Sequence, residues 1–481
     1  MLSGRSETTS MRARHVLRLP PARALLEQSE PRTPNLPDWS SAVNARWWGT
    51  DGASTRWGGA RLARCEEHAP GANRSGIGYP VAVKNGQLQL VWRKRNNKRA
   101  GPRFAEFFAG IGLVRMGLEA KGWSLAYAND IDPEKRAMYD AHFGDADEHF
   151  DLGDVHNVDG SKLPDVELAT ASFPCTDLSL AGARLGLQGG QSSAFWGFIA
   201  AIRGMGIRRP PLVLLENVVG FLTSRGGADF RVAMEALNEL GYAVDAFILD
   251  ARWFVPQSRP RLFVVGSMIP DRNALPSAPE SRIRPALLRR FIASHPGIRW
   301  QLRDLPEPPP RSELLLSDIL EDLPEDAPEW WSRERAEYLY SQFSERHRTA
   351  ADAMIAKRRW SYATVFRRVR MQADGKKRSM GELRTDGIAG CLRTPKGGSG
   401  RQILFKAGYG RYAVRLLTPR ECARLMGADE FTIGVSASQA YFGFGDAVCV
   451  PAISWIAEHY LNPALASVRS ESNRTSSMWA H

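Results

Sequence analysis

A cysteine follows an apolar segment at a point where a nucleophile would be accessible. Cys175 stands in the sequence PCTDLS, soon after residues 166–172, which have the length and apolar character of a buried strand. Most single cysteines are inert and buried, and that alternative stays open at this point. A thiol at a strand end becomes nucleophilic when positive neighbours lower its pKa, and Arg259 and Arg261 are candidates for that role.

Polar side chains also stand next to two further predicted strands. Glu216 follows the apolar run 212–215, and Gln257, Arg259 and Arg261 lead into the apolar run 262–265. Alternation along a strand entry would point these three side chains to one face. Glu216 could instead cap a turn, and the arginines could belong to a solvated strand start. Three separate strand ends that deliver a thiol, a carboxylate and paired arginines favour one common site.

A glycine-rich turn could bind a nucleoside. The sequence FAGIG, which contains Phe108, Gly110 and Gly112, lies between a predicted strand and a predicted helix. Small residues there let a ligand approach the backbone at a helix N-terminus, although such turns often have no function. Asp130 ends the next predicted strand, where nucleotide-binding sheets place a carboxylate against ribose hydroxyls. Because Leu113 stands where a further glycine is usual, a nucleoside without a diphosphate fits better than NAD.

An open α/β sheet would bring these residues to one edge. The predicted strands are 103–108, 125–129, 166–172, 212–215, 243–249 and 262–265, and they alternate with amphipathic stretches. A helix is predicted over 113–120, Asp132 and Pro133 predict the start of another, and Thr418 and Glu421 form a capping box for a third. Ligands bind at the carboxyl ends of strands in such sheets.

Composition narrows the class of protein. The chain has 481 residues, of which 43% are hydrophobic and 24% charged, as in globular proteins. We expect no membrane span and no secretory signal, and therefore a cytoplasmic location. The 5 cysteines are scattered and include no CxxC pair, so neither a disulfide framework nor a metal site is expected. The net charge of +12, most of it within residues 1–100, favours a polyanionic partner.

The motifs together resemble those of the DNA (cytosine-5) methyltransferases. In order they are FAGIG at Phe108, the strand end at Asp130, GDV at Asp154, PC at Cys175, ENV at Glu216 and QSRPR at Gln257. After a gap come PRECARLMG, which begins at Pro419, and GFGDAV, which ends at Val448. The sequence departs from the family's usual pattern at Glu106, where Asp is common, at Thr176, where Gln is common, and at Asp446, where Asn is usual.

This resemblance implies a Rossmann-like class I methyltransferase fold, α/β with a mostly parallel sheet, and a second, smaller, irregular target-recognition domain. The implied domain map is a basic, poorly ordered extension (1–100), the catalytic and cofactor-binding domain (101–268), the target-recognition domain (269–385), the return to the catalytic domain (386–462) and a polar tail (463–481).

The resemblance also implies roles for single residues. Cys175 would attack carbon 6 of a flipped-out cytosine, Glu216 would contact ring nitrogen 3 and the exocyclic amine, and Arg261, Arg259 and Gln257 would brace the base and its phosphate. The implied cofactor is S-adenosylmethionine, with no metal. The residues implied to bind it are Phe108, Gly110, Gly112, Asp130, Ile131, Asp154, Pro174, Phe195, Asp446, Ala447 and Val448.

The implied substrate is double-stranded DNA. The basic segment 346–378 suits phosphate and groove contacts, and we expect Arg358, Arg359, Arg367, Arg368 and Arg370 to bind DNA, unless the segment is a solvated basic face. We expect a monomer that protects host DNA in a restriction-modification system. The sequence leaves open whether a cognate restriction endonuclease exists, and no stable complex with one is expected. Two alternatives remain: a catalytically idle DNA-binding regulator on the same scaffold and an RNA cytosine methylase of the same fold.

Overall fold

A computed structural model describes residues 81–84 and 87–90 as backbone, and residues 101–174, 194–371, 375–394 and 400–467 with their side chains. Cys175, most of the predicted N-terminal extension and most of the polar tail lie outside these described residues. The chain divides into two units, Met1–Asn73 and Arg74–His481, and all described residues belong to the second.

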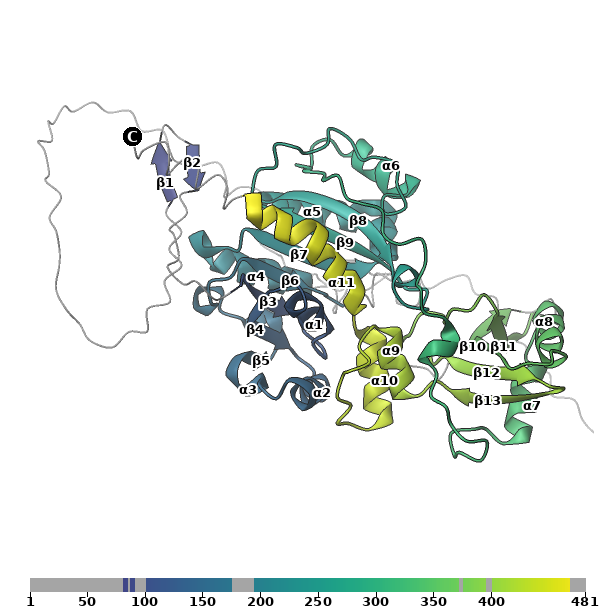
Figure 1. The fold of residues 1–481 in the computed structure, drawn as a ribbon. Helices are drawn as coiled ribbons and strands as arrows, with labels where there is room; N and C mark the ends of the chain where they lie inside the picture. Colours follow the sequence, from purple (N-terminus) through teal and green to yellow (C-terminus); the bar gives the residue numbers. More distant parts are fainter. Residues whose placement is uncertain are drawn as a thin grey trace, which may run out of the picture. The chain divides into compact units, whose positions relative to one another are not determined.

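The described part of the chain alternates strands and helices (Figure 1). The strands are β1 (Val81–Lys84), β2 (Gln87–Leu90), β3 (Arg103–Phe107), β4 (Ser124–Asp130), β5 (Phe150–Leu152), β6 (Leu168–Ala171), β7 (Leu212–Val218), β8 (Ala243–Asp250), β9 (Pro260–Ser267), β10 (Ser361–Met371), β11 (Lys377–Arg384), β12 (Ile403–Gly408) and β13 (Arg411–Leu416). The helices are α1 (Leu113–Glu119), α2 (Pro133–Phe143), α3 (Ala146–His149), α4 (Ala194–Gly204), α5 (Ala228–Glu239), α6 (Ala286–Ser294), α7 (Arg333–Ser341), α8 (Glu345–Ile355), α9 (Pro419–Leu425), α10 (Ala437–Asp446) and α11 (Val450–Ile456).

The main sheet confirms the expected α/β fold. Its 7 strands have the order β5-β4-β3-β6-β7-β9-β8. The strands from β5 to β7 pair in parallel, whereas β9 pairs antiparallel with both β7 and β8. The chain moves from β3 outward to β5 and then returns to β6 on the other side of β3. This reversal places the carboxyl ends of β3 and β6 next to each other, which is where such sheets bind ligands.

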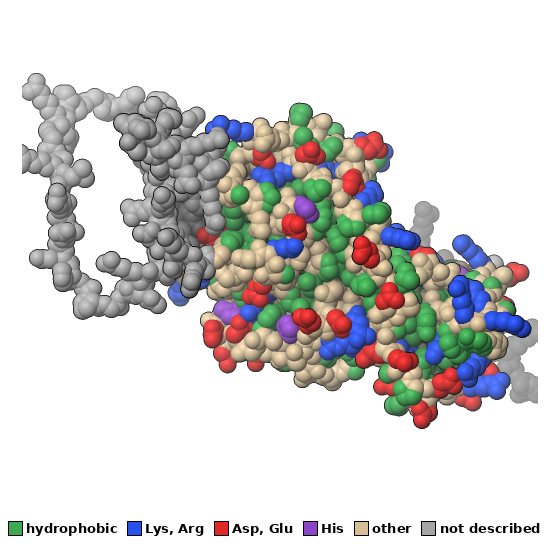
Figure 2. Space-filling model, viewed as in Figure 1, with side chains coloured by type: hydrophobic (Ala, Val, Ile, Leu, Met, Phe, Trp, Pro, Cys, Tyr) green, Lys and Arg blue, Asp and Glu red, His purple; other side chains and the backbone are tan. Residues whose placement is uncertain are grey.

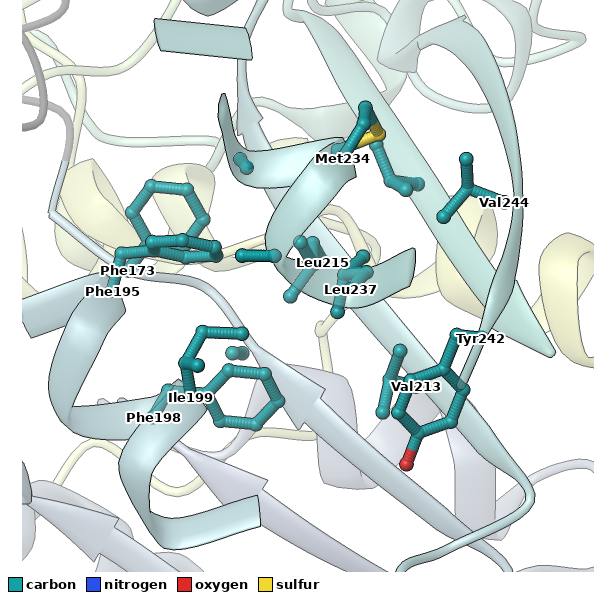
Figure 3. Close-up of a cluster of buried hydrophobic side chains, with 14 of the residues drawn as sticks. Phe173, Phe195, Phe198, Ile199, Val213, Leu215, Met234, Leu237, Tyr242 and Val244 are labelled. Carbon is teal, nitrogen blue, oxygen red and sulfur yellow. The ribbon is translucent and has the colours of Figure 1, made fainter. Parts of the chain in front are cut away.

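Helices cover both faces of this sheet. Val213 and Leu215 of β7 pack against α4 and α5 (Figure 3), whereas Leu212 and Leu214 face a second core that α1 and α11 help to form. This alternation buries both faces of the strand, as expected for the interior of a doubly wound sheet. The unbroken apolar character of residues 212–215, which predicted the strand, therefore has a direct cause.

One apolar helical stretch needs a separate comment. Ala437–Ser467 is long and apolar enough to cross a membrane by length and composition alone. However, 67% of its apolar window is buried inside the protein, and Ile453, Ile456 and Tyr460 belong to the core beneath the main sheet. The apolar character of this stretch is therefore explained by packing against the sheet.

The second sheet is regular, although the sequence predicted an irregular domain. It is antiparallel, with the order β11-β10-β12-β13, and residues of α7 and α8 share one core with Val365, Phe405 and Val414. Two of its strands precede residue 385 and two follow it. By contrast, Leu288 and Phe291 of α6 pack into the core of the main sheet. The sheet therefore combines strands from both sides of the expected boundary.

The predicted helix starts are present. Asp132 accepts hydrogen bonds from the backbone N–H groups of Glu134 and Lys135, and Pro133 is the first residue of α2. Thr418 and Glu421 form the reciprocal capping box at the start of α9. Both helices therefore begin where their side chains satisfy the free N–H groups of the first turn.

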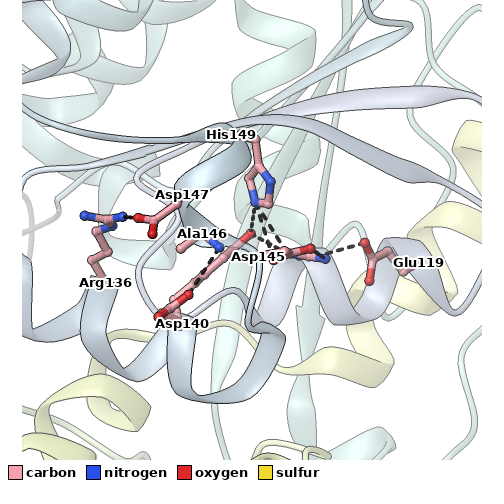
Figure 4. Close-up of polar contacts among 9 residues, drawn as sticks. Glu119, Arg136, Asp140, Asp145, Ala146, Asp147 and His149 are labelled. Carbon is pink, nitrogen blue, oxygen red and sulfur yellow. Dashed lines mark hydrogen bonds and ion pairs between the residues drawn. The ribbon is translucent and has the colours of Figure 1, made fainter.

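A buried arginine fixes α1 to its neighbours. Arg115 of α1 donates to Asp145 at 2.6 Å, to Glu119 at 2.9 Å and to the hydroxyl of Tyr139 at 2.8 Å. Figure 4 shows Glu119, Asp145 and His149 gathered at this point. The cluster lies directly behind the glycine turn that begins α1, and it therefore holds that turn against α2 and α3.

Glu106 of β3 lies buried beside this cluster. Only 2% of the residue is exposed, and its Oε2 atom has no hydrogen-bond partner among the described residues. Burial raises the pKa of Glu106 to about 8, because the nearby Arg115 offsets only part of the cost of removing a carboxylate from water. Glu106 is therefore protonated at neutral pH.

This protonation predicts a pH-dependent stability. Unfolded Glu106 ionises near 4.5, so between this pH and about 8 the folded protein holds one more proton than the unfolded chain. The free energy of unfolding of the wild type, relative to Glu106→Gln, should therefore fall with rising pH across this window, by up to about 1.4 kcal/mol per pH unit. Urea unfolding at several pH values measures it, with Glu119→Gln as the matched control. A difference that stays constant from pH 5 to 8 would contradict a protonated Glu106.

Candidate active site

The glycine turn has the backbone geometry of a ligand-binding turn. Gly110 and Gly112 have φ values of 56° and 81°, and Phe108 has φ 58°, which is rare for an aromatic residue. A Cβ atom on Gly110 would have no neighbour closer than 4.0 Å, so the backbone there faces open space. On Gly112 it would lie 2.5 Å from the Phe143 ring, so this glycine is required by packing. The two glycines therefore serve different purposes.

Asp130 joins the turn to the next strand. Its carboxylate accepts hydrogen bonds from the backbone N–H groups of Gly110 at 2.8 Å and Asp132 at 2.9 Å. Burial raises the pKa of Asp130, although Lys135 and these two N–H groups oppose the shift. The structure thus brings Asp130 to the glycine turn, as the sequence predicted, and it shows that this carboxylate also shapes the turn.

Lys135 of α2 is a charged residue that the sequence analysis did not assign. Its Nζ atom lies 2.9 Å from Oδ2 of Asp446, so the ion pair connects α2 with the end of α10 beside Gly110. Burial lowers the pKa of Lys135, whereas the carboxylates of Asp446 and Asp130 raise it. The effect of the carboxylates is the larger, so the net shift of the pKa is upward. The aspartate that replaces the family's usual asparagine therefore has a cationic partner here. Only the unusual residue type at position 446 could have signalled this pair.

Glu216 and Arg261 lie side by side where β7 ends and β9 begins. Because β9 runs antiparallel to β7, the first residues of β9 lie beside the last residues of β7. Nε of Arg261 lies 2.9 Å from Oε1 of Glu216, and both side chains are largely buried. Burial raises the pKa of Glu216 more than Arg261, Arg259 and Ser172 lower it. The direction of this shift favours the protonated form of the carboxyl group.

The segment that leads to Cys175 is attached to this edge. Nδ2 of Asn217 donates to the backbone carbonyl of Phe173 at 3.1 Å, and both residues are buried. Pro174 is exposed, and Cys175 follows directly outside the described residues. Asn217 belongs to the ENV motif but was given no role from the sequence. Its hydrogen bond holds the segment before Cys175 next to Glu216.

Gln257 and Arg259 lie in the interior, where they contact protein groups. Gln257 donates to the carbonyl of Leu425 at 2.7 Å and accepts from the N–H of Leu392 at 3.0 Å. Arg259 donates to the carbonyls of Leu392 at 2.7 Å, Ala447 at 2.6 Å and Gly445 at 3.1 Å. Their exposed fractions are 0% and 2%. The expected bracing of the base and its phosphate is therefore available to Arg261, whereas the other two side chains are engaged with the backbone.

Cys391 is a second cysteine close to these arginines. Nη1 of Arg259 lies 3.3 Å from its Sγ atom. Burial raises the pKa of the Cys391 thiol, but Arg259, Arg261 and Arg393 outweigh that effect and the pKa is lowered. The sequence analysis treated this cysteine only as one of five scattered residues. No local pattern could reveal it, because it approaches Arg259 from a distant part of the chain.

The remaining expected cofactor residues are spread around the edge. Ile131 is 66% exposed, directly after Asp130. Asp154 lies at the surface, where hydrogen bonds from His156 lower its pKa. Phe195 is fully buried and packs against Phe173 at a ring distance of 5.3 Å, so it supports the segment before Cys175 from inside the core. Ala447 and Val448 adjoin Asp446, and Val448 is buried.

The expected DNA-binding arginines lie away from this edge. Arg358 and Arg359 are exposed in the connection between α8 and β10, and Arg367, Arg368 and Arg370 lie on β10. Figure 2 shows Lys and Arg side chains, together with acidic ones, over the part of the chain that carries α7, α8 and the second sheet. Among the described residues no group of His, Cys, Asp and Glu is arranged to hold a metal ion.

Comparisons with known proteins identify the family of the chain. Residues 102–462 match the sequence profile of the C-5 cytosine-specific DNA methylase family. The chain is 29% identical over 371 residues to the type II methyltransferase M.HhaI of Haemophilus parahaemolyticus, covering 76% of this chain and 95% of that protein. It is 26% identical to the type II methyltransferase M.MspI of Moraxella sp, covering 77% and 72%.

A solved structure shares the fold. The methyltransferase EhMeth of Entamoeba histolytica superimposes with a TM-score of 0.50 at 15% identity, covering 75% of this chain and 98% of that chain. At this identity the likeness concerns the fold alone. The family match, by contrast, extends across both sheets and every strand end described above. The chain therefore belongs to the C-5 cytosine-specific DNA methylase family and is a DNA (cytosine-5) methyltransferase.

Proposed function

We propose that this enzyme methylates a cytosine flipped out of duplex DNA at a specific sequence, and that Cys175 is its nucleophile. The observation that carries the proposal is the buried Glu216–Arg261 pair at the strand end next to the segment that leads to Cys175. A base inside a duplex cannot reach such a site, so it must leave the stack.

The residues at this edge suit covalent attack on cytosine. Carbon 5 of cytosine is a poor nucleophile, and addition of a thiolate to carbon 6 makes the ring electron-rich at carbon 5. Ring electrons displaced by the new sulfur–carbon bond move toward nitrogen 3. The pKa of Glu216 is raised by burial, which favours the protonated carboxyl group, and a hydrogen bond from this group to nitrogen 3 would stabilise that charge. After methyl transfer, loss of the proton on carbon 5 and departure of the thiolate restore the aromatic ring.

Arg261 would lie next to the base, whereas Arg259 would hold the surrounding segments in position. The Arg261 guanidinium already lies against Glu216, so it can orient the carboxyl group and contribute positive charge at this strand end. Arg259 and Gln257 are positioning residues in this scheme, because their hydrogen bonds hold residues 391–392, 425 and 445–447 around the site.

The turn at β3 fits S-adenosylmethionine. The open space at Gly110, the left-handed Phe108 and the carboxylate of Asp130 suit an adenosine moiety without phosphates. Ile131 offers an exposed apolar side chain beside them, and Lys135 with Asp446 provides both charges. When bound, this cofactor supplies an electrophilic sulfonium methyl group.

The biological setting is inferred from the relatives. M.HhaI and M.MspI are type II methyltransferases, and we propose the same kind of role for this chain, as a cytoplasmic monomer that modifies DNA in a restriction-modification system. We place target recognition in residues 269–385 together with β12 and β13, since these strands complete the sheet of β10 and β11. The net charge of +12 supports a nucleic-acid substrate.

The nucleophile can be tested by trapping. Duplex DNA that carries 5-fluorocytosine at the target lacks the proton that must leave carbon 5, so it should remain covalently attached to the wild type. Cys175→Ser should form no such complex and should lose methyl transfer, because a hydroxyl is a far weaker nucleophile at neutral pH. Denaturing electrophoresis detects the adduct, and Cys391→Ser is the matched control that should still form it. An adduct that survives Cys175→Ser would disprove the assignment.

Glu216 should affect chemistry more than affinity. The hydrogen bond to nitrogen 3 strengthens as the ring gains electrons, so Glu216→Gln should lower the single-turnover rate by roughly two to four decades. The DNA dissociation constant should change much less. Rapid-quench kinetics and fluorescence anisotropy separate the two effects. A variant that lost only affinity would give Glu216 a structural role instead.

Asp130 should contribute to cofactor binding. Charge-assisted hydrogen bonds to a ribose diol are worth about 1.5 to 3 kcal/mol, so Asp130→Ala should raise the S-adenosylmethionine dissociation constant about ten-fold or more. Isothermal titration calorimetry measures it. Asp132→Ala is the control, since it removes the cap of α2 and should lower thermal stability with a smaller effect on binding. An unchanged constant in Asp130→Ala would rule out this contact.

A further inference from the structure

The second sheet extends into a two-stranded ribbon. β12 pairs with β10 only as far as Val365, whereas the pairing of β10 with β11 continues to Met371 and Lys377. On the outer edge of β11, the backbone N–H of Gly381 donates to the carbonyl of Gln342, which lies in the connection between α7 and α8. Residues 367–371 and 377–381, called the ribbon below, have no further strand beside them within the described parts of the chain.

The ribbon is strongly basic and exposed. Its charged side chains are those of Arg367, Arg368, Arg370, Lys377 and Arg378, and the ribbon contains no acidic residue. Val369 and Met371 are 59% and 62% exposed, although both are apolar. A basic ribbon with exposed apolar side chains matches a polyanion whose surface also offers apolar groups, as the major groove of DNA does through thymine methyl groups.

The arginines of the ribbon are held in different ways. The Arg367 guanidinium lies 5.5 Å from the ring centre of Trp331, and that of Arg368 lies 5.1 Å from the ring of Phe366. Side chains alternate along a strand, so Arg368 and Arg370 share one face and Arg367 lies on the other. Of the three, Arg370 is the farthest along β10 from the rest of the sheet.

Arg370 is oriented by the one acidic side chain at the base of the ribbon. Its Nε and Nη2 atoms donate to Oε1 of Glu382 at 2.9 Å and 2.5 Å. Its side chain remains 49% exposed, whereas that of Glu382 is 20% exposed. A planar guanidinium that offers two parallel donors is the group that recognises the O6 and N7 acceptors of guanine. Glu382 therefore holds the Arg370 guanidinium in a defined orientation.

We propose that the ribbon enters the major groove of the target duplex and that Arg370 reads a guanine there. The inference rests on the proposed action on duplex DNA. The major groove is about 12 Å wide and admits a two-stranded ribbon, whose strands lie about 4.8 Å apart. Two simpler roles would explain a basic ribbon without base reading: contacts to phosphates, and charges that keep an exposed edge from pairing with other chains.

A binding selection distinguishes these roles. The full chain and its variants are each incubated with a duplex library of random sequence, and the bound duplexes are sequenced. Wild type should select a motif that contains a guanine preferred about ten- to hundred-fold over other bases. Arg370→Lys keeps the charge but loses the paired donors, so it should lose the preference at that guanine and retain the rest of the motif. Arg333→Lys, an exposed change on α7, is the matched control.

Two results would overturn the inference. If Arg370→Lys selected the wild-type motif while Arg370→Ala bound all sequences more weakly, Arg370 would contact phosphates only. If both variants matched wild type, the ribbon would serve only to protect its own edge. Methylation of the selected duplexes tests the proposed function separately: a motif that is bound but not methylated would contradict that function and leave the ribbon's role intact.

Discussion

The site depends on one buried guanidinium. Arg259 lies directly before β9 and donates to the backbone carbonyls of Leu392, Gly445 and Ala447, which are more than a hundred residues away in the sequence. Burial lowers the pKa of this arginine, because desolvation disfavours its charged form, and the carbonyl acceptors at its two Nη atoms offset part of that cost. Because the buried charge needs these acceptors, the segments that contain Leu392 and Gly445 must pack against Arg259.

The packing of these segments around Arg259 also positions other charged and polar groups. It places the thiol of Cys391 beside Arg259 and carries Asp446 to Lys135 next to the glycine turn. The glycine turn and the Glu216–Arg261 pair are therefore connected through polar contacts of the same segments. Groups held in this way need little reorganisation during reaction, which is the main source of electrostatic catalysis. The second sheet, by contrast, keeps its basic ribbon exposed, as the proposed contact with DNA requires.

The sequence predicted what depends on local patterns. Apolar runs located the strands β3, β4, β6, β7, β8 and β9, and the caps at Asp132 and Thr418 located two helix starts, because these signals lie within a few residues of each element. The predicted strand that stopped at residue 215 continues to Val218, since pairing with β9 extends it over Glu216 and Asn217. Likewise the sequence predicted that Gln257 and Arg259 contact the base and its phosphate, whereas both are buried against segments more than a hundred residues away. Contacts between residues far apart in the sequence produce no local sequence pattern.

Methylation of carbon 5 of cytosine within one DNA sequence can be measured in cells. Plasmid DNA is isolated from a host without cytosine methylases that expresses the full chain, and it is analysed by bisulfite sequencing. We expect cytosines that resist conversion at a single position of one recurring sequence, on duplex DNA, and nowhere else. Complete conversion of every cytosine, in cells that contain the folded protein, would contradict it.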